Sequence, residues 1–202
     1  TAHQLGTPIS SLMAWMDLLE SSGVDPSLLS DMNKDVNRLS VIAERFSKIG
    51  SKPEMELIYV NEVLENATEY MRRRVSDKVL ITTHLPSDAE GAMVCLSLFE
   101  WVIENLCKNA VDAMNGEGRI DVYMTSEKQQ IYIDIKDTGK GIARKNFKTV
   151  FNPGYTTKKR GWGLGLTLAK RIIEDYHAGR IYVKDSEVGK GTIFRIELKR
   201  VV

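Results

Sequence analysis

The first fifty residues repeat apolar positions at the spacing of two helices that each need a partner. Leu5, Ile9, Leu12, Met16 and Leu19 are separated by four, three, four and three residues, the repeat of a coiled-coil seam. A second run with this repeat contains Leu28, Met32, Leu39, Ile42, Phe46 and Ile49. Gly23, followed by Asp25 and Pro26, predicts a short turn between them. We therefore expect an α-helical hairpin over residues 1 to 50, closed by a second copy into a homodimeric four-helix bundle.

Beyond the break "GSKPEM" at residues 50 to 55, helix and strand patterns alternate. Helical periodicity covers residues 60 to 74, 96 to 114 and 163 to 177. Strand-like alternation covers residues 78 to 85, 119 to 125, 130 to 136, 179 to 185 and 191 to 199, and a loop rich in Gly, Lys and Thr runs from about 138 to 162. This order predicts a second domain from 55 to 202, built as an α/β two-layer sandwich.

Composition narrows the classes of function. The 202 residues are 43% hydrophobic and 27% charged, and a net charge of +1 gives no reason to expect binding to nucleic acid or to a membrane surface. No apolar run has the length of a membrane span, and no signal peptide is recognisable. Cys95 and Cys107 lie in apolar segments, which predicts reduced core thiols in a cytoplasmic protein. Because the chain starts inside a helical pattern without an initiator Met, we expect it to be part of a longer protein.

One face of the helix predicted over 96 to 114 gathers polar side chains suited to a metal-bound phosphate. Asn105, Lys108, Asn109 and Asp112 lie within an arc of about 60°. Phe99, Ile103, Leu106, Ala110 and Met114 lie on the other side and are expected to face the sheet. Asn is a weak helix former, and the amide oxygen of Asn109 suits Mg²⁺. A solvated polar face explains this segment equally well when it is taken alone.

Two glycine-containing segments add features of a nucleotide site. Asp137 continues the apolar face of the preceding strand, so its carboxylate needs a partner, and the exocyclic amine of a base would be one. Gly139 and Gly141 would let that base approach the backbone, although an Asp that ends a strand at a turn is the alternative. The segment "GWGLGL" at 161 to 166 opens a helix with glycines, as phosphate sites do, and "TTKKR" at 156 to 160 supplies cations.

The order of these motifs resembles that of the sensor histidine kinases of two-component signalling, over essentially the whole chain. "HQLGTP" is similar to the phosphoacceptor motif, "ENLCKNAVDAM" to the N box, "DTGKGI" to the G1 box, "NFKTVFNPGYTTK" to the F box and ATP lid, and "GWGLGL" to the G2 box. The resemblance implies a dimerisation and histidine-phosphotransfer hairpin at 1 to 50. It also implies a catalytic ATP-binding domain of the gyrase, chaperone and histidine kinase superfamily at 55 to 202.

By the same resemblance, the expected cofactors are ATP and Mg²⁺. The expected partners are a second copy of the chain and a response regulator receiver domain, without nucleic acid. The implied location is cytoplasmic, and the cytoplasmic part of a membrane-bound sensor is an alternative that stays open.

The resemblance also implies roles for single residues. His3 is the residue phosphorylated, Asn109 coordinates Mg²⁺, and Asp137 accepts from the adenine amino group. Asn105 and Lys108 line the phosphate side, Lys158 contacts the γ-phosphate, and Phe147 and Phe151 anchor the lid. The other cofactor-binding positions are Asp112, Gly139, Gly141, Ile142, Thr157, Gly161, Gly163, Leu164, Gly165 and Leu166. Thr7 matches the position that orients water for hydrolysis of the phosphorylated partner, which implies phosphatase activity. His84 and His177 are interpreted as ordinary surface or core residues.

Gln4 departs from the acidic residue that many members carry directly after the phosphoacceptor. Its amide oxygen can accept a hydrogen bond from the imidazole N–H of His3, but it stabilises a developing imidazolium less than a carboxylate does. We therefore expect Gln4→Glu to raise the autophosphorylation rate, and an unchanged rate would contradict this reasoning. Gly6 and Pro8 predict a bend in the helix one turn beyond His3.

Two alternatives stay open at this point. Some proteins of the same fold hydrolyse ATP to drive a conformational switch and place a Glu base one turn before the Mg²⁺-binding Asn. Here that position is Asn105, and Glu104 is rotated from it by about 100°. The other alternative is a nucleotide-binding scaffold with weak kinase activity, which Gln4 keeps open.

Overall fold

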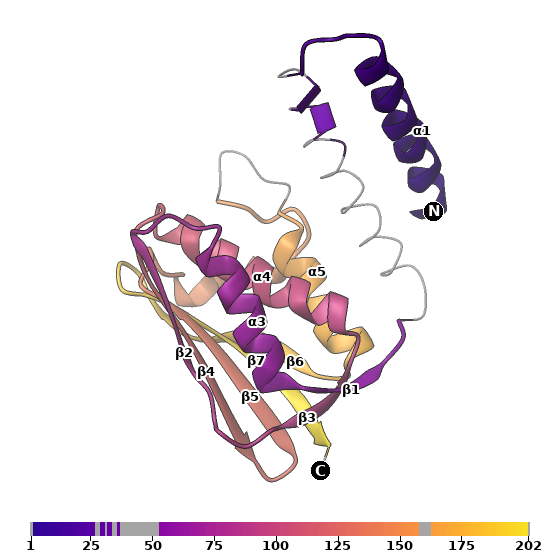
Figure 1. The fold of residues 1–202 in the computed structure, drawn as a ribbon. Helices are drawn as coiled ribbons and strands as arrows, with labels where there is room; N and C mark the ends of the chain where they lie inside the picture. Colours follow the sequence, from indigo (N-terminus) through magenta and orange to yellow (C-terminus); the bar gives the residue numbers. More distant parts are fainter. Residues whose placement is uncertain are drawn as a thin grey trace. The chain divides into compact units, whose positions relative to one another are not determined.

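The computed structural model describes residues 2 to 26, 29, 30, 32, 33, 36, 53 to 157 and 163 to 201, with the backbone alone for residues 2 to 7, 9 and 10. The chain divides into two units, Thr1–Pro53 and Glu54–Val202, and each is described by itself. In the first unit, helix α1 spans Ala2–Ser21 and includes Pro8 (Figure 1). The expected helix therefore runs through the proline.

Among the side chains of α1 that the structure describes, from Pro8 and Ser11 onward, Met16 is buried and several other apolar residues are exposed. Met16 is buried together with Leu29 and Val36, and Val24 packs against them. The exposed apolar side chains of α1 are Leu12, Met13, Trp15, Leu18 and Leu19. Most of the expected second helix lies outside the described residues, so the hairpin and its dimer stay predictions.

The second unit is built on one mixed sheet. Its strands are β1 (Glu56–Tyr59), β2 (Val79–His84), β3 (Gly91–Val94), β4 (Gly118–Glu127), β5 (Gln130–Asp137), β6 (Arg180–Glu187) and β7 (Gly191–Val201). The order is β1-β3-β7-β5-β4-β2, and β6 pairs with β7 outside this path. Only β2 and β4 run parallel among these pairs; the others are antiparallel. The two short strands β1 and β3 were not expected from the sequence.

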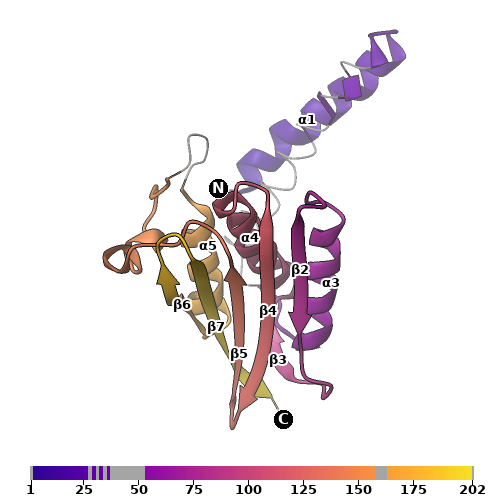
Figure 2. The ribbon, with the colours of Figure 1, turned by 90° about the vertical axis from the view of Figure 1, so that its left-hand side faces the viewer.

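Three helices cover one face of this sheet. They are α3 (Val60–Arg72), α4 (Leu96–Ala113) and α5 (Gly165–Arg171), and Figure 2 shows them side by side behind the strands. A π-helical turn, Ile172–Tyr176, continues α5, and short 3₁₀ turns occupy Arg144–Asn146 and Thr149–Phe151. The predicted two-layer α/β arrangement is confirmed for this unit.

The central helix α4 and the central strands form the core. On α4 the buried side chains are Leu98, Phe99, Val102, Ile103, Leu106, Cys107 and Ala110. On β5 every second residue, Ile131, Ile133 and Ile135, is buried at 1% exposure or less. This alternation places the next residue in register, Asp137, on the same helix-covered side. Cys95 and Cys107 are buried and unpaired, and burial raises the pKa of the Cys107 thiol to about 12.

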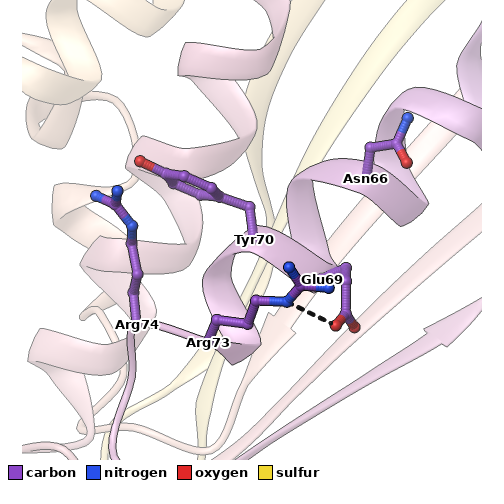
Figure 3. A pocket seen from close by; sticks show the side chains of 5 residues that line it. All are labelled: Asn66, Glu69, Tyr70, Arg73 and Arg74. Atoms are coloured by element: carbon purple, nitrogen blue, oxygen red, sulfur yellow. Dashed lines mark hydrogen bonds and ion pairs between the residues drawn. The ribbon is translucent and has the colours of Figure 1, made fainter.

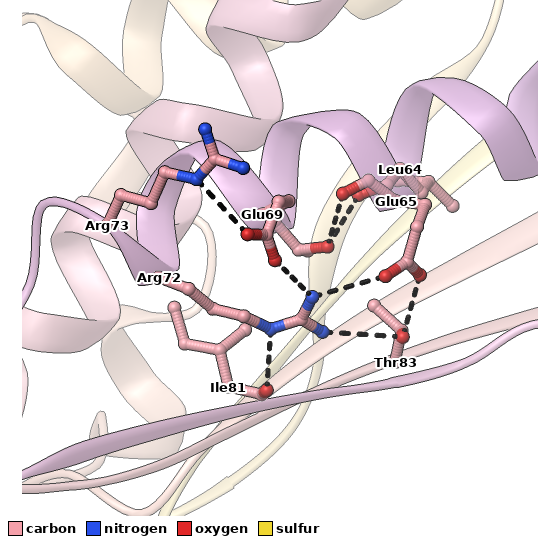
Figure 4. Close-up of polar contacts among 8 residues, drawn as sticks. Leu64, Glu65, Glu69, Arg72, Arg73, Ile81 and Thr83 are labelled. Carbon is pink, nitrogen blue, oxygen red and sulfur yellow. Dashed lines mark hydrogen bonds and ion pairs between the residues drawn. The ribbon is translucent and has the colours of Figure 1, made fainter. Parts of the chain in front are cut away.

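A polar network fastens α3 to the edge strand β2 (Figure 4). The Arg72 guanidinium lies 3.1 Å from Glu65 Oε1 and 3.1 Å from Glu69 Oε2, and its Nε donates to the carbonyl oxygen of Ile81 at 3.1 Å. The Thr83 hydroxyl donates to Glu65 Oε2 at 2.8 Å. These contacts hold α3 against a strand that has only one neighbour in the sheet.

Glu90, in the turn before β3, links the start of α3 to the strands β4 and β7. Its carbonyl oxygen accepts from the Val60 N–H at 2.9 Å, and its carboxylate accepts from the Ser126 hydroxyl at 2.7 Å. Arg200 Nε lies 2.5 Å from Glu90 Oε2, and Glu90 is only 4% exposed. Directly beside it, Gly91 pairs with Tyr59 of β1 and with Val201 of β7.

Candidate nucleotide-binding site

Asp137 is the buried carboxylate of the candidate site. It ends β5, is 3% exposed, and lies on the helix-covered side that the strand alternation predicts. Its Oδ1 accepts from the Gly139 N–H at 2.7 Å, and the Thr192 N–H also donates to the carboxylate. Burial raises the pKa of Asp137, and the two backbone hydrogen bonds partly oppose that rise. The two backbone N–H groups thus orient the Asp137 carboxylate, and its oxygens can accept further hydrogen bonds.

Two glycines in the loop after Asp137 let the loop lie close to the end of α4 and to the β6–β7 hairpin. A Cβ on Gly139 would lie 2.8 Å from the Cβ of Ala113, at the end of α4, and the Lys140 N–H donates to the Ala113 carbonyl oxygen at 3.0 Å. Gly141 has a φ of +71°, and a Cβ there would lie 2.1 Å from the Glu187 carbonyl oxygen. Both glycines are therefore needed for close backbone packing in this structure.

The β6–β7 hairpin forms the other side of this contact. Gly191 has a φ of +117°, and a Cβ there would lie 1.9 Å from the Asp137 carbonyl oxygen. The Gly189 N–H donates to the Lys140 carbonyl oxygen at 2.8 Å, and the Ile142 N–H donates to Ser186 Oγ at 2.7 Å. We call the segments 137 to 142 and 186 to 192, held together by these contacts, the backbone clamp.

Sequence reasoning missed the hairpin half of the backbone clamp. Ser186, Gly191 and Thr192 follow Asp137 by about fifty residues, and only the pairing of β5 with β7 sets Asp137 opposite Thr192. The available signal was "GKGT" at 189 to 192, where glycines directly precede a strand. We interpreted that segment only as the start of the last strand.

The polar face of α4 lies next to the start of α5. Asn105 and Asn109 are partly buried, whereas Lys108 and Asp112 are exposed. A Cβ on Gly165 would lie 2.5 Å from Asn105 Oδ1, so an alanine at this position would displace the Asn105 amide. Within the described part of the chain, the buried Asn105 Nδ2 has no hydrogen-bond partner. A buried amide N–H left without an acceptor suits a site that receives an anionic or polar ligand.

Gly154 and Gly163, near the two ends of the segment between the 3₁₀ turns and α5, lie close together. The Gly154 N–H donates to the Gly163 carbonyl oxygen at 3.2 Å, and Gly163, with a φ of +64°, would place a Cβ 2.5 Å from the Gly154 carbonyl carbon. Lys140 Nζ donates to Thr157 Oγ1 at 2.9 Å, which links this segment to the backbone clamp. Phe151 is buried and meets Phe194 edge-on, with ring centroids 6.2 Å apart.

The remaining predicted positions divide between exposed, partly buried and undescribed residues. Leu164 is exposed, and Ile142, Phe147 and Leu166 are partly buried. Lys158 and Gly161 lie outside the described residues. His3, Gln4 and Thr7 belong to α1 in the other unit, where the backbone alone is described. The structure therefore brings together Asp137, the G1-like glycines and the end of α4, and separately Asn105 and Gly165.

A shallow pocket lies elsewhere, on the outer face of α3. It is lined by Asn66, Glu69, Tyr70, Arg73 and Arg74 (Figure 3). Arg74 stacks on Tyr70 at 4.1 Å from the ring centroid, and Arg73 Nε lies 3.2 Å from Glu69 Oε1. Four of these side chains thus contact one another in pairs, and none of the five residues belongs to the predicted site.

His177 is a core residue with both ring nitrogens engaged. Nε2 accepts from the Cys95 N–H at 3.0 Å, and Nδ1 donates to the Ile172 carbonyl oxygen at 2.8 Å. Burial lowers the pKa of His177, so the ring is neutral in the fold. Among the described residues, no group of three or more His, Cys, Asp or Glu side chains is arranged to hold a metal ion, and no helix is long and apolar enough to span a membrane.

Comparison with known proteins gives one family match and relatives over nearly the whole chain. Residues 96 to 202 match the family described as histidine kinase-, DNA gyrase B- and HSP90-like ATPase. Sporulation kinase E of Bacillus subtilis is 30% identical over 98% of this chain, which corresponds to 27% of that protein. The chain thus spans between about a quarter and a half of the length of these curated relatives, from 24% to 47%.

Solved structures agree with the fold. Full-length ShkA in complex with AMPPNP has a TM-score of 0.83 at 20% identity, covering 100% of this chain and 45% of that one. Histidine kinase ThkA in complex with the response regulator protein TrrA has a TM-score of 0.68 at 20% identity, covering 99% of this chain and 60% of that one. At this level of identity, these likenesses support the fold alone.

Proposed function

The chain belongs to the histidine kinase-, DNA gyrase B- and HSP90-like ATPase family, and from this membership we propose that it is the kinase portion of a sensor histidine kinase. It binds ATP in the unit Glu54–Val202, transfers the γ-phosphoryl group to His3, and then passes it to an aspartate of a response regulator. Likeness to sporulation kinase E over 98% of the chain supports this reading, because a match of that extent continues from the ATP-binding unit through most of the first fifty residues.

The observation that carries the nucleotide proposal is the buried carboxylate of Asp137. A carboxylate on the helix-covered side of a sheet needs donors, and two backbone N–H groups, of Gly139 and Thr192, donate to this one. The amino group of adenine supplies a further donor. The glycines at 139 and 141 let the loop beside this carboxylate pack closely against α4 and the β6–β7 hairpin.

Residues on α4 are proposed to hold the phosphates and the metal. Asn109 would ligate Mg²⁺ through its amide oxygen, and Mg²⁺ would offset the charge that develops on the phosphates. Asn105 has a buried N–H available for a phosphate oxygen, and Lys108 and Lys158 add positive charge. Asp112, Thr157 and the glycines at 161, 163 and 165 border the same space in this proposal.

Transfer requires a neutral imidazole at His3. With an ordinary histidine pKa near 6.5, the ring is mainly neutral at pH 7 and has a free lone pair on one nitrogen. That nitrogen forms the new bond to the γ-phosphorus while the bond to the bridging oxygen breaks and ADP leaves. Gln4 orients the other ring N–H, and Thr7 is assigned to positioning the water that hydrolyses the phosphorylated response regulator.

The first unit is proposed to act as a dimer. The exposed Leu12, Trp15 and Leu18 leave a broad apolar surface on α1 that a second copy would cover. We propose a domain boundary between residues 50 and 55, and the division of the chain into two units after Pro53 supports this placement. An aspartate-bearing receiver domain as the phosphoryl acceptor is the matching proposal for the partner.

One experiment separates this proposal from its alternatives. The chain is incubated with Mg²⁺ and γ-labelled ATP, and the label is followed on protein and as free phosphate. Acid-labile label that stays on the parent protein and is absent from His3→Ala supports the kinase. Free phosphate without labelled protein would instead indicate an ATPase switch, and neither product would indicate a nucleotide-binding scaffold.

A further inference from the structure

Ser186 lies at the centre of a hydrogen-bonded cluster inside the backbone clamp. Its Oγ accepts from the Ile142 N–H at 2.7 Å and donates to the Gly191 carbonyl oxygen at 2.8 Å. A third contact, of 2.9 Å, joins Ser186 Oγ to Thr192 Oγ1. One hydroxyl thus connects the loop after β5 to both strands of the β6–β7 hairpin.

The direction of the third hydrogen bond follows from the other two. A serine hydroxyl has one hydrogen, and a carbonyl oxygen can only accept. Because the Ser186 hydrogen goes to Gly191, the hydrogen between Ser186 and Thr192 must come from Thr192. Thr192 Oγ1 therefore has no hydrogen left for a ligand and can act toward one only as an acceptor.

Thr192 and Asp137 face the same space. They are directly paired between β7 and β5, so their side chains lie on one face of the sheet, about 5 Å apart at Cβ. Both residues are buried, at 4% and 3% exposure. An ionised carboxylate also only accepts, so the pair presents acceptors alone to whatever binds beside it.

A local irregularity in β6 is what puts Ser186 in this position. The pairing of β6 with β7 shifts between Val183 and Asp185, so that Ser186 stands opposite Thr192. Without the shift, the strand would set Asp185 opposite Thr192 and bring a second carboxylate toward Asp137. Two neighbouring carboxylates on the buried side would repel each other, so the bulge selects a hydroxyl in place of a charge.

We propose that Ser186 is a positioning residue that fixes the hydroxyl of Thr192 as an acceptor and thereby makes the pocket selective for a base with an exocyclic amino group. The inference rests on the proposed nucleotide binding of this site and adds the source of its base specificity. A base that presents a carbonyl oxygen at the same edge meets two acceptors and no donor. Such a base is therefore rejected, because its oxygen would be left unpaired.

The test compares two nucleotides that differ at this edge. The dissociation constants of ATP and of inosine triphosphate, which carries a carbonyl where ATP carries the amino group, are measured by calorimetry on the 202-residue chain. The parent is expected to prefer ATP. Ser186→Ala frees the Thr192 hydroxyl to rotate and donate, so the ATP preference should fall by roughly 3- to 10-fold, the range of one neutral hydrogen bond.

Three variants separate positioning from general loosening. Ser186→Thr keeps the hydroxyl and should restore the preference. Ser126→Ala removes another partly buried strand hydroxyl, the one that donates to Glu90, and should leave the preference unchanged. Thr192→Val removes the second member of the relay, so Ser186→Ala should have no further effect on the ratio in that background. Should Ser186→Ala fail to fold, Thr192→Val alone is still expected to lower the ratio.

The outcomes are distinct. If Ser186→Ala weakens both nucleotides equally, or if its effect on the ratio persists in Thr192→Val, the residue is merely structural and the inference is overturned. If the parent binds ATP and inosine triphosphate equally, the inference is also overturned while nucleotide binding stands. If the parent binds neither, the proposed function fails together with it.

Discussion

Replacement of Gly141 by Ala tests whether the backbone clamp depends on direct contact between two main chains. The left-handed backbone at Gly141, with a φ of +71°, costs an L-residue about 1 to 2 kcal/mol. The smaller entropy of the unfolded Ala chain returns up to about 1 kcal/mol. A Cβ at 2.1 Å from the Glu187 carbonyl oxygen must also push the hairpin away by about 1 Å, and overpacking of this kind costs about 1 to 3 kcal/mol.

Gly189 supplies the matched control. It has a similar φ of +85° and lies in the same hairpin, but nothing is within 4 Å of a Cβ built there. Gly189→Ala should therefore cost only the backbone strain, about 1 kcal/mol net, and Gly141→Ala about 2 to 4 kcal/mol. At about 2 to 4 °C per kcal/mol for a chain of this size, the two melting temperatures should differ by several degrees.

Thermal unfolding followed by circular dichroism measures that difference, and ATP titration of both variants provides a second reading. Gly141→Ala separates the Ile142 N–H from Ser186, so it should weaken ATP binding, whereas Gly189→Ala should not. Equal losses of stability in the two variants would refute the claim that close contact, rather than backbone conformation alone, requires glycine at position 141.

Three further predictions concern neighbouring parts of the fold. Because burial raises the pKa of Asp137, its ionised form destabilises the fold, and this cost appears as the pH rises through the window above the ordinary value of 3.8. Asp137→Asn should therefore raise the melting temperature at pH 7 without nucleotide, yet weaken ATP binding by roughly 10-fold or more in titrations. Burial lowers the pKa of His177, so the effect of pH is opposite: the free energy of unfolding should fall as the pH drops below 6.5. Urea unfolding measured at several pH values between 7 and 5 gives the dependence of that free energy on pH, which should be weaker in His177→Gln. An unchanged pH dependence in this variant would exclude His177 as the cause. Gly165→Ala meets only the movable side chain of Asn105, so it should cost less than about 1 kcal/mol in unfolding while measurably lowering ATP affinity.

The long elements of the second unit were predictable because each carries many repeats of one period. Helix α4 buries the apolar stripe that its sequence shows, and β5 alternates so regularly that the direction of Asp137 followed from it. The strands β1 and β3 have four residues each, which is too few for a period to be recognised. Their positions depend on pairing with each other and with β7, which is a long-range property.

The same limit explains what was missed near the site. The relay from Thr192 through Ser186 depends on the register between distant strands and on a bulge that no local pattern marks. Within the helix predicted over 163 to 177, the structure has α-helix only to Arg171 and then a π-helical turn. Spacings of three and four residues are kept through such a turn, so the apolar pattern does not distinguish the two.

The strand pairing at Gly91, next to Glu90, determines what is needed to join the two ends of this unit. Tyr59 of β1 and Val201 of β7 pair with opposite sides of Gly91, so these two strands are two strand spacings apart, about 10 Å. Because both strands are antiparallel to β3, they run in the same direction, and the start of β1 lies at the far end of that strand from Val201. A linker from Val202 to Glu54 must therefore cross the sheet and run back along β1, roughly 20 Å in all, so circular permutation of the unit calls for a flexible linker of about 15 residues. New termini could be opened in the hairpin between β4 and β5, where residues 127 to 130 are exposed and lie outside the backbone clamp.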